Sequence, residues 1–167
     1  EHEVLEFAGG RLLLRGVNGS GKSTAMNMLL PLLVTARQGR IDAAGEQTGI
    51  LKSWMLTGRD DPQPVGYLWI EFARATREGA EYTVCGCGIK ANRQADTVTT
   101  WWFVTELRPN LDVHLVEGGA ALSVDALRAV LGHDAVFPEG RRRDYRAEVE
   151  RRLFCGTHAH RETLSAV

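Results

Sequence analysis

Several features that define particular protein classes are scarce or missing in this sequence. The three cysteines among 167 residues include no C-x-x-C pair, which argues against a disulfide framework and against a zinc site. No apolar run approaches the ~18 residues of a membrane span, and the first residues lack the basic and apolar regions of a signal peptide. The formal net charge is only −1, so any contact with nucleic acid would need a local basic patch. We therefore expect a cytoplasmic protein without a membrane partner.

Lysine is also rare, since only three of the twenty basic residues are lysines. One of them, Lys22, lies in the segment GVNGSGKST, residues 16–24, which matches the phosphate-binding pattern G-x-x-x-x-G-K-[ST]. Glycines in this loop let backbone N–H groups turn toward phosphate oxygens, Lys22 adds a positive charge, and the Ser23 hydroxyl is placed to bind Mg²⁺. We predict ATP and Mg²⁺ as the ligands. The predicted nucleotide-binding residues are Asn18, Gly19, Ser20, Gly21, Lys22, Ser23 and Thr24, with Ser23 also holding the metal.

The segments on either side of this loop agree with that interpretation. The apolar run at residues 11–15 predicts a buried strand before the loop, and residues 24–30 predict a helix after it. Residues 4–7 are expected to pair with the first of these as a hairpin. A glycine-rich turn that binds no ligand is the alternative, but it leaves the order of strand, loop and helix unexplained.

Downstream of the loop, the sequence predicts a run of strands. Four apolar segments are separated by short connections, which favour antiparallel neighbours. These predicted strands are residues 65–75, 81–90, 97–106 and 111–116. The polar stretch before them, residues 35–64, predicts a loop with one short helix near residues 49–56.

Alternation along the strands predicts which side chains are buried. Cys85 and Cys87 are expected on the same face as buried free thiols, while Trp101 and Trp102 are expected on opposite faces. Aromatic side chains can stack on nucleobases, but at strand spacing within an apolar run they more often belong to a core. We therefore do not select the aromatic residues as nucleic-acid contacts.

The last third of the sequence predicts two helices. Ser123 is the expected N-cap of a helix over residues 124–131, and Gly132 is its expected C-cap. The second helix is expected over residues 141–154. Its apolar face is predicted to be formed by Tyr145, Val149 and Leu153.

The second of these helices carries the only basic concentration in the chain. Residues 141–152 contain six arginines and three carboxylates, which leaves a local charge of +3. A charge run of this kind is often only a solvated helix face, and that remains the alternative. We select Arg142, Arg143 and Arg146 as candidate contacts to DNA phosphates, which would be bound without regard to base sequence.

The parts that complete a P-loop ATPase are missing. Such an enzyme needs an acidic residue after a hydrophobic strand, and the class that dimerises over ATP also needs a serine-glycine signature. Glu71 and Glu106 end apolar runs, but neither is followed by a predicted helix, and Glu117-Gly-Gly119 is no signature loop. No catalytic residue can therefore be assigned, and the isolated chain is expected to be inactive.

The early hairpin, the loop interior with Asn18 and Ser20, and the antiparallel strands together resemble the N-terminal lobe of an SMC-type ATPase head. SMC stands for structural maintenance of chromosomes, a group within the ABC class of ATPases. Residues 101–105 and 144–154 look more like bacterial MukB-type and Wadjet-type relatives than like chromosomal condensin or cohesin. One departure is that no glutamine follows Gln94, so the Q-loop glutamine of the family has no counterpart here.

This resemblance implies a fold and a set of partners. The fold would be the N-terminal half of a P-loop head, an α/β class with α+β character, with residues 1–167 as a single partial domain and 155–167 as a tail. A long coiled coil and a C-terminal lobe of the same or a related chain would supply the signature and Walker B motifs. A second head would join on ATP-dependent dimerisation, and DNA would be a further partner.

Two other functions remain open. A small P-loop phosphotransferase, such as a kinase, would need a general base and an arginine lid, which residues 141–143 could supply. Such kinases alternate strands with helices, unlike the consecutive strands expected here. A non-catalytic interaction module that keeps ATP as a structural ligand is the other alternative.

Overall fold

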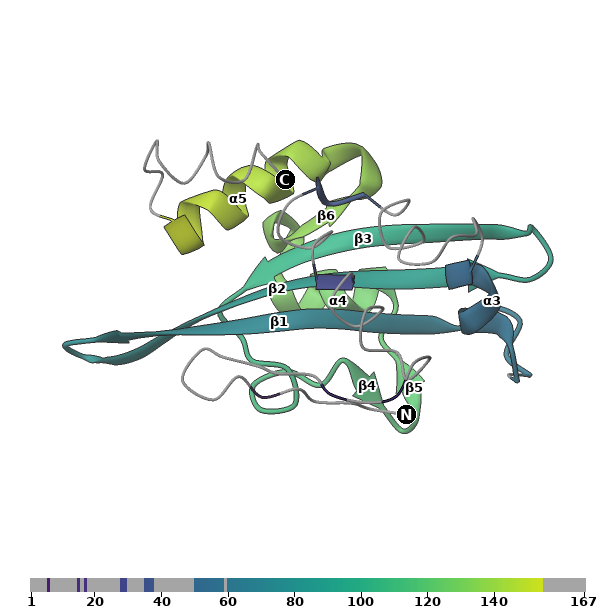
Figure 1. The fold of residues 1–167 in the computed structure, drawn as a ribbon, viewed down its shortest axis with the longest axis horizontal. Helices are drawn as coiled ribbons and strands as arrows, with labels where there is room; N and C mark the ends of the chain where they lie inside the picture. Colours follow the sequence, from purple (N-terminus) through teal and green to yellow (C-terminus); the bar gives the residue numbers. More distant parts are fainter. Residues whose placement is uncertain are drawn as a thin grey trace.

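The computed structural model describes residues 6, 15, 17, 28–29, 35–37, 50–58 and 60–154 (Figure 1). Residues 28–29 are helical, and the first element described along its whole length is α3, Ile50–Leu56. The strands are β1 Val65–Thr76, β2 Gly79–Asn92, β3 Thr97–Thr105, β4 Val116–Glu117, β5 Ala120–Ala121 and β6 Val136–Pro138. The later helices are α4 Val124–Leu131, η2 His133–Ala135, η3 Glu139–Arg141 and α5 Arg142–Phe154.

The main sheet has the strand order β1-β2-β3-β6, and every neighbouring pair is antiparallel. β1 and β2 form a long hairpin whose turn extends beyond the rest of the sheet, on the left in Figure 1. β4 and β5 make a separate two-stranded ribbon. The described part of the chain is therefore mixed α/β, with antiparallel pairing as the sequence predicts.

Side chains alternate along each strand, so both faces of this sheet carry apolar residues. Helices and loops cover both faces. One face carries Cys85, Cys87 and Trp102, and α3 and α5 pack against it. The opposite face carries Trp101 and Phe103, and it is covered by α4 and by the loop that contains Leu115. The sequence prediction that the two neighbouring tryptophans lie on opposite faces is confirmed.

Two glycines in β2 allow large aromatic rings to lie flat against the sheet. Gly86 pairs with Phe103 and Gly88 pairs with Trp101 across the β2–β3 ladder. A Cβ atom at Gly86 would lie 2.0 Å from Phe103 Cζ, and one at Gly88 would lie 2.1 Å from Trp101 Cε2. Tyr67 packs edge-on against both rings, with centroid distances of 6.0 and 6.1 Å. The glycines thus make room for the most aromatic part of the core.

Local signals define the two longer helices. The Ser123 side chain accepts a hydrogen bond from the Ala126 amide, and Gly132, at φ 90°, ends α4 with its amide bonded to the Arg128 carbonyl. In α5, Tyr145 and Val149 are buried, and Leu153 packs beside them. The predicted caps of α4 and the predicted apolar face of α5 are therefore confirmed.

The predicted strand at residues 111–116 is wrong. The Arg108 carbonyl accepts hydrogen bonds from the amides of residues 111, 112 and 113, so the chain curls into a turn, and Asn110 has a positive φ of 68°. Val113 and Leu115 are buried as loop residues rather than as strand residues. Only Val116–Glu117 forms a strand here, as β4.

No sequence pattern predicts β6, whose three residues pair with Trp101, Trp102 and Phe103. This short strand leads through η3 into α5 and fixes where that helix begins. At the other end of the sheet, Lys52 of α3 forms an ion pair with Asp96, with a 2.5 Å N–O distance, in the β2–β3 turn. No helix in the described residues is long and apolar enough to cross a membrane.

Candidate functional site

The predicted nucleotide loop lies almost entirely outside the described residues. Of the segment 16–24, the structure describes only Val17, which is 80% exposed in a bend. The predicted ligands of ATP and of Mg²⁺, Asn18 to Thr24, are not among the described residues. Those assignments stay predictions from the sequence.

The helical turn after this loop can be placed relative to the sheet. Met28 is half-buried and packs against the hydrophobic cluster on the face that carries Cys85, Cys87 and Trp102. α5 packs against the same cluster through Tyr145 and Val149. Met28 therefore lies on the face of the sheet that α5 covers.

The basic helix predicted from the sequence is α5, and carboxylates already bind most of its arginines. The ion pairs join Arg141 to Asp144, with a 2.7 Å N–O distance, Arg151 and Arg152 to Glu148, each 2.6 Å, and Arg152 to Glu106, 2.9 Å. Arg142 approaches Glu139 at 3.9 Å, a weak contact. The local charge of +3 is therefore much less available than the composition indicates.

Two of the three candidate DNA contacts are not neutralised by a carboxylate among the described residues. Within the part of the chain that the structure describes, no ion pair involves Arg143 or Arg146. Arg143 is exposed and Arg146 is half-exposed. With Arg142 they occupy positions i, i+1 and i+4, which lie along one side of a helix. The paired residues Asp144, Glu148, Arg151 and Arg152 line the other side.

Glu148 is the centre of the paired side. It accepts hydrogen bonds from Arg151 Nε and Nη2, at 2.8 and 2.6 Å, and from Arg152 Nε at 2.6 Å. Hydrogen bonds from Arg151 and Arg152 lower the pKa of Glu148 to about 2. The carboxylate is therefore ionised throughout the physiological pH range.

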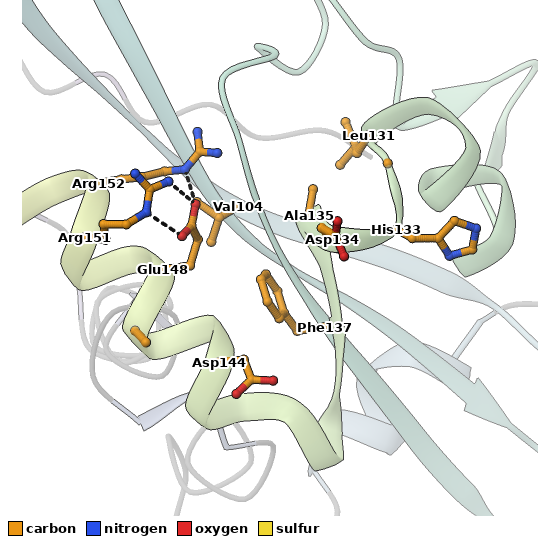
Figure 2. Close-up of a pocket in the computed structure, with 12 residues that line it drawn as sticks. Val104, Leu131, His133, Asp134, Ala135, Phe137, Asp144, Glu148, Arg151 and Arg152 are labelled. Atoms are coloured by element: carbon orange, nitrogen blue, oxygen red, sulfur yellow. Dashed lines mark hydrogen bonds and ion pairs between the residues drawn. The ribbon is translucent and has the colours of Figure 1, made fainter.

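A groove of about 620 Å³ lies between α5 and the connection from α4 to β6. Figure 2 shows Val104 and Phe137 between the two walls, with Glu148, Arg151 and Arg152 on the α5 side and the ring of His133 pointing away from α5. The charged groups of the α5 wall pair with one another, with Glu106 or with Arg141, whereas Asp134 on the opposite wall is in no ion pair among the described residues. The floor of the groove is apolar.

The two buried thiols are not reactive groups. Burial raises the pKa of Cys85 to about 12 and that of Cys87 well above its ordinary value. Both belong to the hydrophobic cluster under α5. Among the described residues, no group of three His, Cys, Asp or Glu side chains could hold a metal ion. The prediction of buried free thiols is confirmed for Cys85 and Cys87.

The carboxylates that bind the α5 arginines could be found from the sequence only in part. The i,i+3 and i,i+4 spacings of Glu148 to Arg151 and Arg152 are a recognised helix signal. Glu106 precedes its partner by 46 residues, so no local pattern indicates that pair. No family model, curated protein or solved structure matches the chain.

Proposed function

We infer that this chain is the ATP-binding lobe of an SMC-like, DNA-associated ATPase head. The observation that carries this proposal is the segment GVNGSGKST at residues 16–24. Its glycines, Lys22 and Ser23 have roles in holding nucleotide phosphates and Mg²⁺, and residues 28–29 after it are helical. The fold we propose is accordingly the N-terminal half of a P-loop head of the SMC type.

The arrangement downstream of the loop supports this proposal. Three consecutive strands, β1 to β3, form an antiparallel meander, in agreement with the SMC-type resemblance. A small P-loop kinase would instead alternate strands with helices. The described residues therefore give no specific support to the kinase alternative.

Hydrolysis is proposed to require further components. Glu71 and Glu106 are not proposed as the water-activating acid, since neither is followed directly by a helix, and they form ion pairs with Arg108 and Arg152. The water-activating acid and the signature motif would come from a C-terminal lobe of the same or a related chain, and a second head would complete the site.

Binding and turnover together test this proposal. The chain is titrated with ATP in the presence of Mg²⁺ by calorimetry, and phosphate release is measured on the same sample. We expect saturable binding with phosphate release at the background rate. An absence of binding would remove the proposed nucleotide site, and steady turnover by the chain alone would contradict the split-head assignment.

A further inference from the structure

The helical turn at residues 28–29 and α5 share one hydrophobic cluster. Tyr145 and Val149 of α5 are buried within it, and Met28 borders it. Trp102 lies at its centre, 5.5 Å from the Tyr145 ring. α4 belongs to a separate cluster on the opposite face of the sheet. α3 and α5, but not α4, therefore share their core with Met28, which follows the phosphate loop in sequence.

Ser23 precedes Met28 by five residues, so the predicted phosphate contacts are close along the chain to this cluster. Phosphate binding by a P-loop depends on the positions of backbone N–H groups, and small displacements of such groups weaken it. Met28 is thus the described residue through which we expect the cluster to influence phosphate binding.

α5 packs on the sheet through one side of the helix, where Tyr145 and Val149 are buried. Its apolar contacts come from one side only, since Arg143, Asp144 and Ala147 are exposed. Near its end it is tied to the sheet by the Arg152–Glu106 ion pair, whose carboxylate is 78% exposed. Single elements of a protein can open locally, at free energies up to that of global unfolding, and amide hydrogen exchange measures such opening.

We propose that nucleotide binding at residues 16–24 and docking of α5 on the sheet are energetically linked through this shared cluster. The linkage rests on the proposed function, because it needs a nucleotide at the loop. When α5 separates, Tyr145 and Val149 leave the cluster, and the segment around Met28 loses apolar neighbours. Linkage is reciprocal, so a bound nucleotide stabilises the docked helix to the same extent that the docked helix strengthens nucleotide binding.

Two matched valine variants test the linkage through affinity. Val149→Ala removes two methyl groups from the α5 side of the shared cluster, whereas Val84→Ala makes the same change on the opposite face, and both side chains are at most 1% exposed. We expect Val149→Ala to weaken Mg-ATP binding about fivefold or more, the lower range of measured couplings, and Val84→Ala to change it less than about twofold. Affinities are compared at a temperature where both variants are folded. Equal affinities would overturn the linkage.

Hydrogen exchange on the unaltered chain provides a second measurement if either variant fails to fold. Mg-ATP should slow amide exchange in α5, residues 142–154, more than in α4, residues 124–131. An equal change in both helices would indicate only a global increase in stability and would overturn the linkage. If the unaltered chain does not bind Mg-ATP, the proposed function fails and the linkage with it. If the chain binds Mg-ATP but α5 does not respond, only the linkage fails.

Discussion

Arg152 Nη1 lies 2.9 Å from Glu106 Oε1, which ties the last turn of α5 to the end of β3. Two residues further along, Arg108 reaches the opposite layer of the molecule, where its guanidinium lies 4.1 Å from the Tyr82 ring centroid and 3.3 Å from Glu71. Residues 106–108, which follow β3, therefore form ion pairs on both sides of the sheet. These contacts join residues far apart in sequence, and the first of them adds to the burial of Tyr145 and Val149 in holding α5 on the sheet.

The Glu148 carboxylate should matter more for stability than that of Glu106. Glu148 is 24% exposed and accepts hydrogen bonds from two arginines, so Glu148→Gln removes the carboxylate bound to Arg151 and one of the two carboxylates bound to Arg152. We expect this substitution to lower the free energy of unfolding by about 1–2 kcal/mol. Glu106→Gln breaks an exposed pair and should cost about 0.5 kcal/mol or less. Urea denaturation measures both, and equal losses would contradict the central role of Glu148.

The contribution of Glu148 should also depend on pH. Its pKa is lowered from 4.5 to about 2 by hydrogen bonds from Arg151 and Arg152, so the folded state favours the ionised form. The resulting stabilisation is fully present above about pH 4.5 and is lost as the pH falls through about 2. The difference in unfolding free energy between the unaltered chain and Glu148→Gln should therefore shrink below pH 4.5. A difference that stayed constant down to pH 2 would show that the carboxylate charge is not the cause.

Substitution of Gly86 should disrupt the aromatic core. A Cβ atom at this position would lie 2.0 Å from Phe103 Cζ, and Phe103 is fully buried. We expect Gly86→Ala to lower the free energy of unfolding by about 3 kcal/mol or to prevent folding, since the ring has no free space to enter. Gly140→Ala is the control, because nothing lies within 4 Å of a Cβ atom there. Thermal denaturation of both variants checks this, and similar melting temperatures would contradict it.

Much of this architecture follows from local sequence patterns. The Ser123 cap, the buried pair Cys85 and Cys87, and the opposite faces of Trp101 and Trp102 depend on neighbouring residues, which a sequence displays directly. The nucleotide loop is likewise a local motif, and it is known here from its sequence alone.

Long-range pairing could not be predicted in the same way. Residues 111–116 carry strand-like apolar alternation, yet hydrogen bonds to the Arg108 carbonyl and the positive φ of Asn110 turn the chain instead. β6 has only three residues, and its partner β3 ends 31 residues earlier, so neither its length nor its surroundings predict a strand. The sequence does not show that the arginines of α5 are partly neutralised, because Glu106, one of the carboxylates that binds them, is distant in sequence.

Lys22 should be needed for nucleotide binding and not for folding. An ammonium that contacts phosphate only when ligand is present contributes little to the nucleotide-free protein. We expect Lys22→Ala to weaken Mg-ATP binding at least about tenfold, the loss of one charged hydrogen bond, with an unchanged melting temperature in the absence of nucleotide. Lys52→Ala is the control, because Lys52 pairs with Asp96 at the surface. A large drop in nucleotide-free stability would instead give Lys22 a structural role.

The DNA prediction now depends on Arg143 and Arg146. The remaining arginines of residues 141–152 already contact carboxylates, so these two carry the charge that DNA phosphates could meet. We expect the double variant Arg143→Glu/Arg146→Glu to weaken duplex binding and to reduce the salt slope of log K by about 2, close to one for each phosphate that an arginine no longer neutralises. Fluorescence anisotropy over a range of salt concentrations measures both quantities, preferably with the C-terminal lobe and ATP present.

A matched control separates a local contact from the general effect of charge on DNA binding. Arg74→Glu/Arg77→Glu changes the net charge equally but lies at the exposed end of the β1–β2 hairpin, where Arg74 already pairs with Glu81. If α5 meets the phosphates, only the α5 variant should alter the salt slope, and two duplexes of unrelated sequence should respond alike, because phosphate contacts carry no base information. Equal reductions in both double variants would indicate attraction by overall charge alone. Unchanged binding in the α5 variant would leave the helix as a solvated face.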